Sequence, residues 1–558
     1  MWLLCTVALV VACAPPPGGG GQRAQTEEEL AAAQASKVLT IIGRNQPVNL
    51  ALPGLRATGA STSGSTGPFN AALDTADGRE SNVPQLAEAL PQLNTDTWKV
   101  LPDGRMETRY TLRPNLSWHD GTPLSAEDFV FAFRVYSTPE LGASPSALRT
   151  DMQMSAPDSR TILIEWRRPR HEAGALGTTG APLPRHILEE PLQTLTPDAF
   201  VAHPYWTLEF VGLGPYRLTR WEPGAFLEGA AFDGYVWGKP RIGKVKVQWT
   251  LDENVALANL LSENVQYVTD LALRFEQASV LKRTWGPTSG GAAIGSPTSA
   301  RFLWIQQRPE VATPRSLTDL RVRRGLAHSV DRQALNDGLF EGEGLMTDTM
   351  VRPNEPWFAE TERLKVTYPF DLRRTEQLMG EAGYARAPDG VFVDAAGERF
   401  DPEIMNQPGA QPERETAIMR EIWKRAGIES HLELELSANT ERRAMFPSLQ
   451  AGGGLVGVGS LVTTAIGTPA NRFAGSNRSG WSNPEFDALY ARWSVTLDAD
   501  EHGRLEAQMR RIQTEQLPGV PLFFNLQIAA WLAGLNGPDV QASSVPNLVW
   551  NMHVWTLN

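Results

Sequence analysis

From residue 38 onward, runs of alternating apolar and polar residues are interspersed with segments whose apolar residues recur at helical spacing. Alternation predicts strands, because successive side chains on a strand point to opposite faces; these runs are KVLTIIG (37–43), TRYTLR (108–113), TILIEW (161–166), KVKVQWTL (244–251) and SHLELEL (430–436). Helical spacing predicts helices at 126–136, 253–261, 371–384, 416–427, 483–493 and 504–517. Their irregular order, without an internal repeat, indicates an α/β or α+β protein with mixed sheets in more than one lobe.

Capping residues mark the ends of several of these helices. Asp371 is placed as an N-cap, and Gly383 as the end of the same helix. Asn483 precedes Pro484 as an N-cap precedes a proline at the first helical position. Gly427 ends the helix before it, because glycine readily adopts the left-handed conformation of a C-terminal cap.

The stretch WHDGTPLSAEDFVF, residues 118–131, places a histidine beside a carboxylate and two further acids nearby. Such a cluster could be catalytic, but each acid also has a structural explanation. Asp120 and the following glycine form a tight turn. Ser125 and Asp128 have the spacing of a capping box, and carboxylates in a first turn favour the positive end of the helix dipole. We therefore interpret the stretch as a turn and a helix start.

Composition narrows the functional classes. The 558 residues carry a formal charge of −12, and that length corresponds to about three or four domains. Nucleic-acid binding is disfavoured because the basic residues are scattered rather than clustered. Cys5 and Cys13 are the only cysteines, so the folded body is expected to hold neither a disulfide nor a thiolate-bound metal.

The N-terminal segment predicts export. MWLLCTVALVVAC (1–13) is apolar but too short to cross a bilayer. Its end resembles a bacterial lipobox, with Cys13 as the lipidated residue, although no Lys or Arg precedes Cys13. Residues 14–37 begin with Pro and Gly runs and are expected to act as a flexible tether, with a short helix at 26–35. The alternative is a short buried N-terminal segment.

Taken in order, the segments resemble family 5 of the extracellular solute-binding proteins, the oligopeptide- and dipeptide-type subunits of ABC importers. The likeness covers about residue 38 to the C-terminus. It is carried by YTLRPNLSWHDGTPLSAEDFVFAFR (110–134), LPRHIL (183–188), VGLGPYRLTRWEPG (211–224), GYVWGKPRIGKVKVQW (234–249), DLRVRRGLAHSVDRQAL (319–335), YPFDLRRTEQLMGEAGY (368–384), SGWSNPEFDAL (479–489) and LPGVPLFF (517–524).

The resemblance implies a two-lobed periplasmic-binding-protein clamp of type II, cluster C, with an additional inserted domain. Domain I is expected to combine residues 38–67, 208–298 and 525–558, domain II to be an insertion at 68–207, and domain III to span 299–524. The implied protein is a monomer without a cofactor or metal, extracytoplasmic and lipid-anchored through Cys13. It would capture a solute between lobes I and III and deliver it to the permease subunits of an ABC importer.

The ligand class is less clear. Peptide-binding members of the family carry an acidic residue for the peptide's ammonium group in the segment that corresponds to 445–481, and this segment contains neither Asp nor Glu. Its loop is Gly-rich, small and hydroxylated, so a peptide, a sugar-like solute or an anionic solute could each fit; the alternative is a simple turn, with the acid supplied elsewhere. The candidate ligand contacts are Asn49, Val458, Ser460, Thr463, Thr464 and Arg472.

Arg472 is a candidate for binding a carboxylate. The alternative for Asn49 is a turn-forming residue, and Trp304 is expected in the core rather than as a platform on which a ligand stacks. An enzyme is disfavoured: none of the eight histidines has a metal-ligand spacing, and GGGLVGVGS lacks the Lys of a phosphate-binding loop. A receptor lobe that binds ligand only to signal remains a further alternative.

Overall fold

The computed structural model describes residues 27–56, 63–142, 147–435, 440–454, 456–540 and 548–558. The predicted export segment, Cys13 and the first part of the tether lie outside these residues. The end of the tether is helix α1 (Glu27–Ser36), as expected. Among the described residues, no helix combines the length and the apolar composition needed to cross a bilayer.

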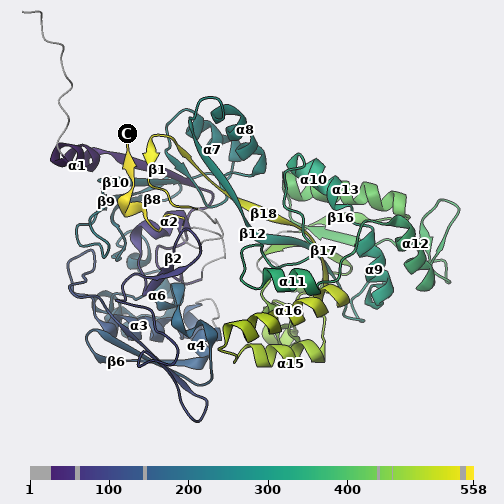
Figure 1. Ribbon diagram of the computed structural model, residues 1–558, viewed down its shortest axis with the longest axis horizontal. Coiled ribbons are helices and arrows are strands. Elements are labelled where there is room, and N and C mark those ends of the chain that lie inside the picture. The colour runs from purple at the N-terminus through teal and green to yellow at the C-terminus, as the bar shows by residue number, and fades with distance from the viewer. Residues whose placement is uncertain (1–26, 57–62, 143–146, 436–439, 455, 541–547) are drawn as a thin grey trace, which may run out of the picture.

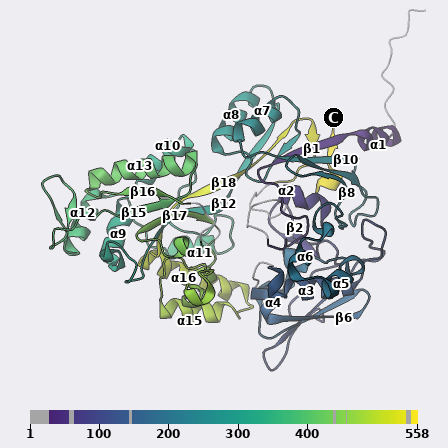
Figure 2. The same ribbon diagram turned by 180° about the vertical axis from the view of Figure 1, so that it is seen from behind.

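Two long antiparallel strands connect two lobes (Figures 1 and 2). Strand β12 (Gly291–Ile305) pairs with β18 (Gly519–Leu532) along nearly its whole length, from Gly291 opposite Leu532 to Trp304 opposite Gly519. The register shifts between Pro297 and Ser299 and again between Arg301 and Phe302. Such irregularities bend a strand and increase its twist, and here they lie in the middle of the connection.

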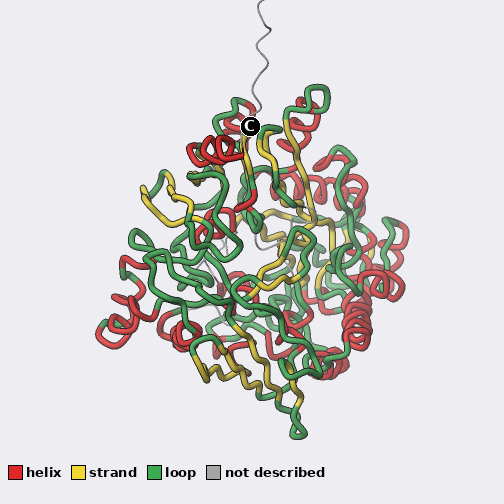
Figure 3. Tube along the Cα trace, turned by 60° about the vertical axis from the view of Figure 1, so that its left-hand side comes forward, coloured by secondary structure: helices red, strands yellow, loops and turns green. Residues whose placement is uncertain are grey.

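A single ten-stranded sheet runs through both lobes. The strands β12 and β18 lie side by side within it and join the strands of one lobe to those of the other. In the first lobe β18 is followed by β11 (Tyr267–Val268), β1 (Val38–Gly43), β10 (Lys244–Trp249), β9 (Phe226–Ala231) and β8 (Tyr216–Glu222). In the second lobe β12 is followed by β17 (Leu449–Gly454), β15 (Glu403–Asn406) and β16 (His431–Leu434). Figure 3 shows strands crossing the middle of the molecule, with many of the helices along its outer edges.

The first lobe has a second part built on a four-stranded sheet of order β4-β5-β7-β6. These strands are β4 (Trp98–Val100), β5 (Met106–Thr111), β7 (Thr161–Trp166) and β6 (Met152–Asp158), and a short hairpin adds β2 (Asp74–Ala76) and β3 (Asn82–Pro84). The lobe's helices are α2 (Ser63–Thr66), α3 (Ala126–Tyr136), α4 (Ala147–Asp151), α5 (Arg185–Thr194), α6 (Pro197–Val201), α7 (Glu253–Leu261) and α8 (Phe275–Trp285); β19 (Leu535–Asn536) and β20 (Thr556–Leu557) bring the C-terminus beside α1.

The second lobe carries longer helices around its part of the sheet (Figure 1). They are α9 (Leu320–His328), α10 (Arg332–Phe340), α11 (Phe358–Leu364), α12 (Leu372–Glu381), α13 (Ala410–Ala426), α14 (Thr440–Ala444), α15 (Pro484–Trp493) and α16 (Ala499–Gln516), with a small hairpin of β13 (Ala385–Arg386) and β14 (Phe392–Val393). Each lobe has its own buried apolar clusters; β18 contributes residues to clusters of both lobes, and β12 contributes residues to those of the second.

The predicted caps are confirmed. Asp371 accepts from the backbone N–H groups of the first turn of α12, Asn483 caps α15, and Gly427 ends α13 at φ +83°. The Gly-rich loop expected within 445–481 is wrong for its first glycines, because Leu449–Gly454 form strand β17 between β12 and β15. Glycines are poor strand formers by themselves, but here two flanking strands supply the hydrogen bonds. The domain limits given above stay predictions.

Candidate functional site

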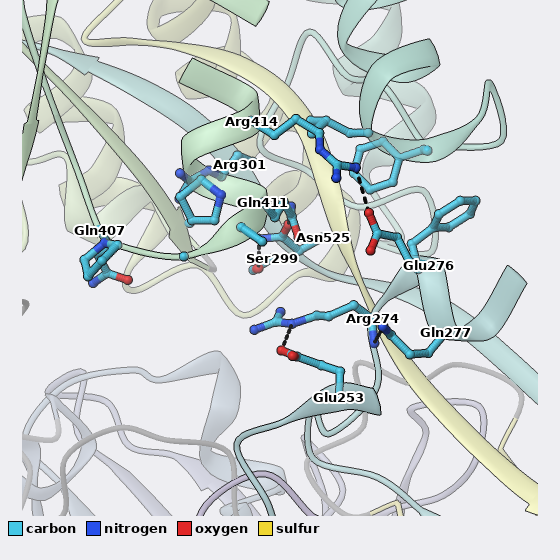
Figure 4. A pocket seen from close by; sticks show the side chains of 18 of the residues that line it. Glu253, Arg274, Glu276, Gln277, Ser299, Arg301, Gln407, Gln411, Arg414 and Asn525 are labelled. Atoms are coloured by element: carbon cyan, nitrogen blue, oxygen red, sulfur yellow. Dashed lines mark hydrogen bonds and ion pairs between the residues drawn. The ribbon is translucent and has the colours of Figure 1, made fainter. Parts of the chain in front are cut away.

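A cavity of about 560 Å³ lies between the two lobes, beside β12 and β18, which we call the crossing strands because they run from one lobe to the other (Figure 4). Arg44, Glu253 and Arg274 line it from the first lobe, whereas Gln407 and Arg414 line it from the second. Ser299, Arg301 and Asn525 contribute from β12 and β18 themselves. A molecule bound here would therefore contact both lobes and the strands that join them.

Two further cavities continue from the first along the second lobe. The second, about 130 Å³, shares Arg301, Gln407 and Gly453 with the first. The third, about 320 Å³, shares Gly453, Arg443 and Arg478 with the second. Because neighbouring cavities have residues in common, we treat the three as one continuous feature and call it the interlobe groove.

Strand β17 supplies the floor of the groove through its glycines. Gly453 lines all three cavities, and Gly454 lines the third. A Cβ atom on Gly453 would lie 3.2 Å from Nδ2 of Asn525, whereas a Cβ on Gly454 would meet no atom within 4 Å. Larger side chains at these positions would project into the groove, so the glycines keep it open.

Arginine dominates the charge of the groove. Its lining includes six arginines and three glutamates: Arg44, Arg274, Arg301, Arg414, Arg443 and Arg478, with Glu253, Glu276 and Glu435. The groove is thus cationic, although the whole chain has a formal charge of −12.

Each of the three glutamates already has an arginine partner. Glu253 is 2.6 Å from Arg44 and 3.6 Å from Arg274, and Glu276 is 2.7 Å from Arg414 of the other lobe. Glu435 lies 3.8 Å from Arg442. Burial, and secondarily the Arg44 cation, lowers the pKa of Arg274. A ligand's ammonium group would therefore find no carboxylate of the lining without an arginine beside it.

Five of the six predicted ligand contacts differ in their surroundings. Ser460 lines the third cavity, next to the buried Val458 that packs in the core behind it. Thr463 bonds Ser482 at 2.7 Å through its hydroxyl, and Thr464 is exposed. Asn49 is buried and donates from Nδ2 to the Leu55 carbonyl at 2.9 Å, which is the bonding of a residue that holds a turn.

Arg472 is exposed at the end of a short 3-10 helix (Pro469–Asn471), with φ +53°, and is not among the residues that line the groove. The following residues 473–476 do line the third cavity. Trp304, expected in the core, is buried and also forms part of that cavity's wall. The six contacts predicted from the sequence stay predictions. The lining of the groove adds Arg478, Arg443 and Gln450 to the candidates.

The predicted turn and helix start at 118–131 are confirmed. Asp128 accepts from the Ser125 backbone N–H at 2.9 Å and from the Arg185 N–H at 3.0 Å. His119 is buried between the Gly214 carbonyl and the Gly212 N–H, and its burial lowers its pKa to about 4. Among the described residues, no group of three or more His, Cys, Asp or Glu side chains could hold a metal ion.

Comparison with known proteins identifies the group to which this architecture corresponds. The model of the family "Bacterial extracellular solute-binding proteins, family 5 Middle" matches residues 88–494. Protein XP55 of Streptomyces lividans is 27% identical over 356 residues, which cover 63% of this chain and 59% of that protein. The match thus spans about three fifths of that relative's length.

Two other relatives match over most of their length. The dipeptide-binding protein of Escherichia coli is 23% identical over 88% of this chain and 90% of its own. The crystal structure of an oligopeptide binding protein from Thermus thermophilus, complexed with a pentapeptide, superposes with a TM-score of 0.76 at 22% identity, over 93% of this chain and 96% of that one. That structure supports the two-lobed α/β fold.

Proposed function

The chain belongs to family 5 of the bacterial extracellular solute-binding proteins, and from that premise we propose that it captures a peptide or peptide-like solute in the interlobe groove for an ABC importer. The single observation that carries the proposal is the position of the groove. Its first cavity is lined by Arg44, Glu253 and Arg274 of one lobe and by Gln407 and Arg414 of the other.

A groove between two lobes can capture a ligand because the bound ligand contacts both lobes. A ligand shifts a protein toward a conformation only if it interacts more favourably with that conformation than with its alternative. A molecule that bridges two lobes does so by stabilising their closed arrangement. The irregular pairing in the middle of β12 and β18 offers a place where the connection can bend, and the closed form would present a surface for a permease.

Peptide is the favoured ligand class because relatives are named for it. The dipeptide-binding protein of E. coli and the oligopeptide binding protein of T. thermophilus are the relevant relatives. A groove of three connected cavities suits an extended molecule better than a compact one.

The rest of the proposal concerns location and chemistry. The protein acts outside the cytoplasm, attached by a lipid on Cys13, with the segment that follows as a tether. It binds its solute unchanged rather than acting as an enzyme. An anionic, non-peptide solute is the second candidate, favoured by the excess of arginines over glutamates in the groove.

The test combines stability, shape and product analysis on the purified protein. Randomised tetra- to hexapeptide libraries should raise the melting temperature, and small-angle X-ray scattering should show a smaller radius of gyration in their presence. Mass spectrometry should recover the bound peptides intact. Cleaved peptides would contradict capture without chemistry, and the absence of any stabilising library would reject peptide as the ligand class.

A further inference from the structure

Arg478 lies where the second and third cavities meet, in a segment that holds its backbone firmly. The neighbouring Asn477 is fully buried, and its Nδ2 donates to the carbonyls of Leu461 at 2.9 Å and Trp481 at 2.8 Å. Ser479 is also buried, and its carbonyl accepts from the Gln307 N–H at 2.8 Å. Arg478 lies between two anchored residues, and its side chain lines the groove.

Arg308 fixes the separation between Arg478 and the neighbouring arginine of the groove. Its Nη1 donates to the Arg478 carbonyl at 2.7 Å and to the Ala444 carbonyl at 2.8 Å. Ala444 directly follows Arg443, so one buried guanidinium ties together the two segments that carry Arg443 and Arg478. The fold therefore holds Arg443 and Arg478, two of the groove's arginines, next to each other.

The Arg478 guanidinium forms no ion pair with a carboxylate of the described residues. Burial, and secondarily the nearby Arg443 cation, lowers its pKa to about 10. The group nevertheless keeps its proton at neutral pH. A partly buried cation beside a like charge is unfavourable unless an anion joins it, which makes this position a place for a ligand's negative group.

A second group at the same place is an unused hydrogen-bond acceptor. Gln450 of β17 lines the second cavity and is only 4% exposed. Its Oε1 has no hydrogen-bond donor among the described residues. A buried acceptor without a partner is costly, so this amide indicates that a ligand supplies an N–H group.

We propose that Arg478 binds a carboxylate of the ligand at the junction of the second and third cavities, and that Gln450 accepts an N–H of the same molecule. The inference rests on the proposed function and specifies its ligand class: an anionic peptide, bound through its acidic end or an acidic side chain. The carboxylate site then lies in the second lobe, in the same acid-free segment as Arg472.

The experiment captures peptides from randomised libraries on the purified full chain and identifies them by mass spectrometry. One library has free C-termini, a second is C-terminally amidated, and a third has free C-termini but lacks Asp and Glu; citrate serves as a non-peptide carboxylate. We expect binding from the free library to be enriched in acidic peptides. Loss in the amidated library would assign the α-carboxylate as the bound group, and loss in the acid-free library would assign a side chain.

Variants connect this preference to the residue. Arg478→Gln should raise the Kd of a captured peptide by about tenfold or more, since a charged hydrogen-bonded pair is lost. Arg478→Lys should lose less, and Arg373→Gln, which changes an exposed arginine of α12 that does not line the groove, should leave the Kd unchanged. The melting temperature without ligand should stay within a few degrees in all three variants, which separates a lost contact from a damaged fold.

The outcomes distinguish this inference from the proposed function. Peptides bound without preference for acid or free carboxylate, or with equal affinity by Arg478→Gln, would overturn the carboxylate site while leaving peptide capture intact. Citrate binding that depends on Arg478, with no peptide captured, would support the site and overturn the peptide function. No binding from any library or of citrate would overturn both.

Discussion

Arg301 of β12, which lines the interlobe groove, forms a buried ion pair with Glu415 of α13. Nε of Arg301 donates to Oε2 of Glu415 at 2.7 Å, and its Nη2 donates to the Asn406 side chain at 2.9 Å. The Glu415 side chain is fully buried, and its other oxygen has no partner among the described residues. Burial raises the pKa of Glu415, and Arg301 opposes that rise. The pair thus connects the crossing strand to the longest helix beside the groove.

Arg301→Ala should reduce the free energy of unfolding by about 3–5 kcal/mol, because it leaves a buried carboxylate uncompensated. Replacing both partners with methionine should cost less than the single change, since no charge then stays buried. Urea denaturation at pH 7 measures both values. A double variant less stable than Arg301→Ala would show that the pair itself, rather than the isolated carboxylate, dominates the energy.

Gly454→Leu should abolish peptide binding with little effect on folding. A Cβ at this position meets no atom within 4 Å, and the side chain would occupy the third cavity. The expected cost in stability is below about 0.5 kcal/mol, as for most changes that disturb no packed group. Isothermal titration with a captured peptide checks the loss. Gly380→Leu, which also meets no atom within 4 Å but lies on α12 away from the groove, is the matched control and should bind normally.

Glu80→Gln should open the two lobes in solution. Glu80 of the first lobe is 3.0 Å from Arg352 of the second, and Asn354 also donates to its carboxylate. Burial raises the pKa of Glu80, against the opposing effect of Arg352. The variant loses the ion pair, so we expect a larger radius of gyration without ligand and a several-fold higher Kd. Glu140→Gln, exposed in the first lobe, should change neither quantity.

Acid should weaken the fold through His502. Its ring stacks on His171 of the other lobe with centroids 4.1 Å apart, and burial, with His171 as a lesser cause, lowers its pKa from 6.5 to about 4. Between these pH values the unfolded chain binds a proton that the folded chain does not, so the free energy of unfolding falls as the pH falls through that window. The expected loss from this residue is on the order of 2 kcal/mol.

His502→Phe keeps an aromatic ring in the stack and should flatten the pH dependence of stability between pH 6.5 and 4. Urea denaturation at four or five pH values in this range measures the slope. The exposed His431→Phe is the control and should keep the slope of the parent protein. The same slope in all three proteins would show that His502 does not cause the pH dependence of stability.

Local sequence signals predicted the elements whose ends depend on nearby residues. Asp371 and Asn483 cap helices because their side chains reach backbone groups two or three positions away. Strand β17 was missed because its hydrogen-bonding partners, at 300–305 and 404–405, are far away in the chain. The same limit applies to the site. Arg472 and Arg478 belong to one acid-free segment, and only the buried bonds of Asn477 and Ser479 place Arg478 on the groove and leave Arg472 outside it.

The crossing strands also determine how the molecule comes apart. Leu303 and Val520 belong to the apolar core of the second lobe, whereas Ile528 and Ala529, further along β18, are buried in cores of the first. Unfolding of either lobe would leave the shared strands without half of their partners, which destabilises the other lobe in turn. Heating should therefore produce a single calorimetric peak rather than one for each lobe. The two lobes would then be one cooperative unit, able to move relative to each other but not to fold separately.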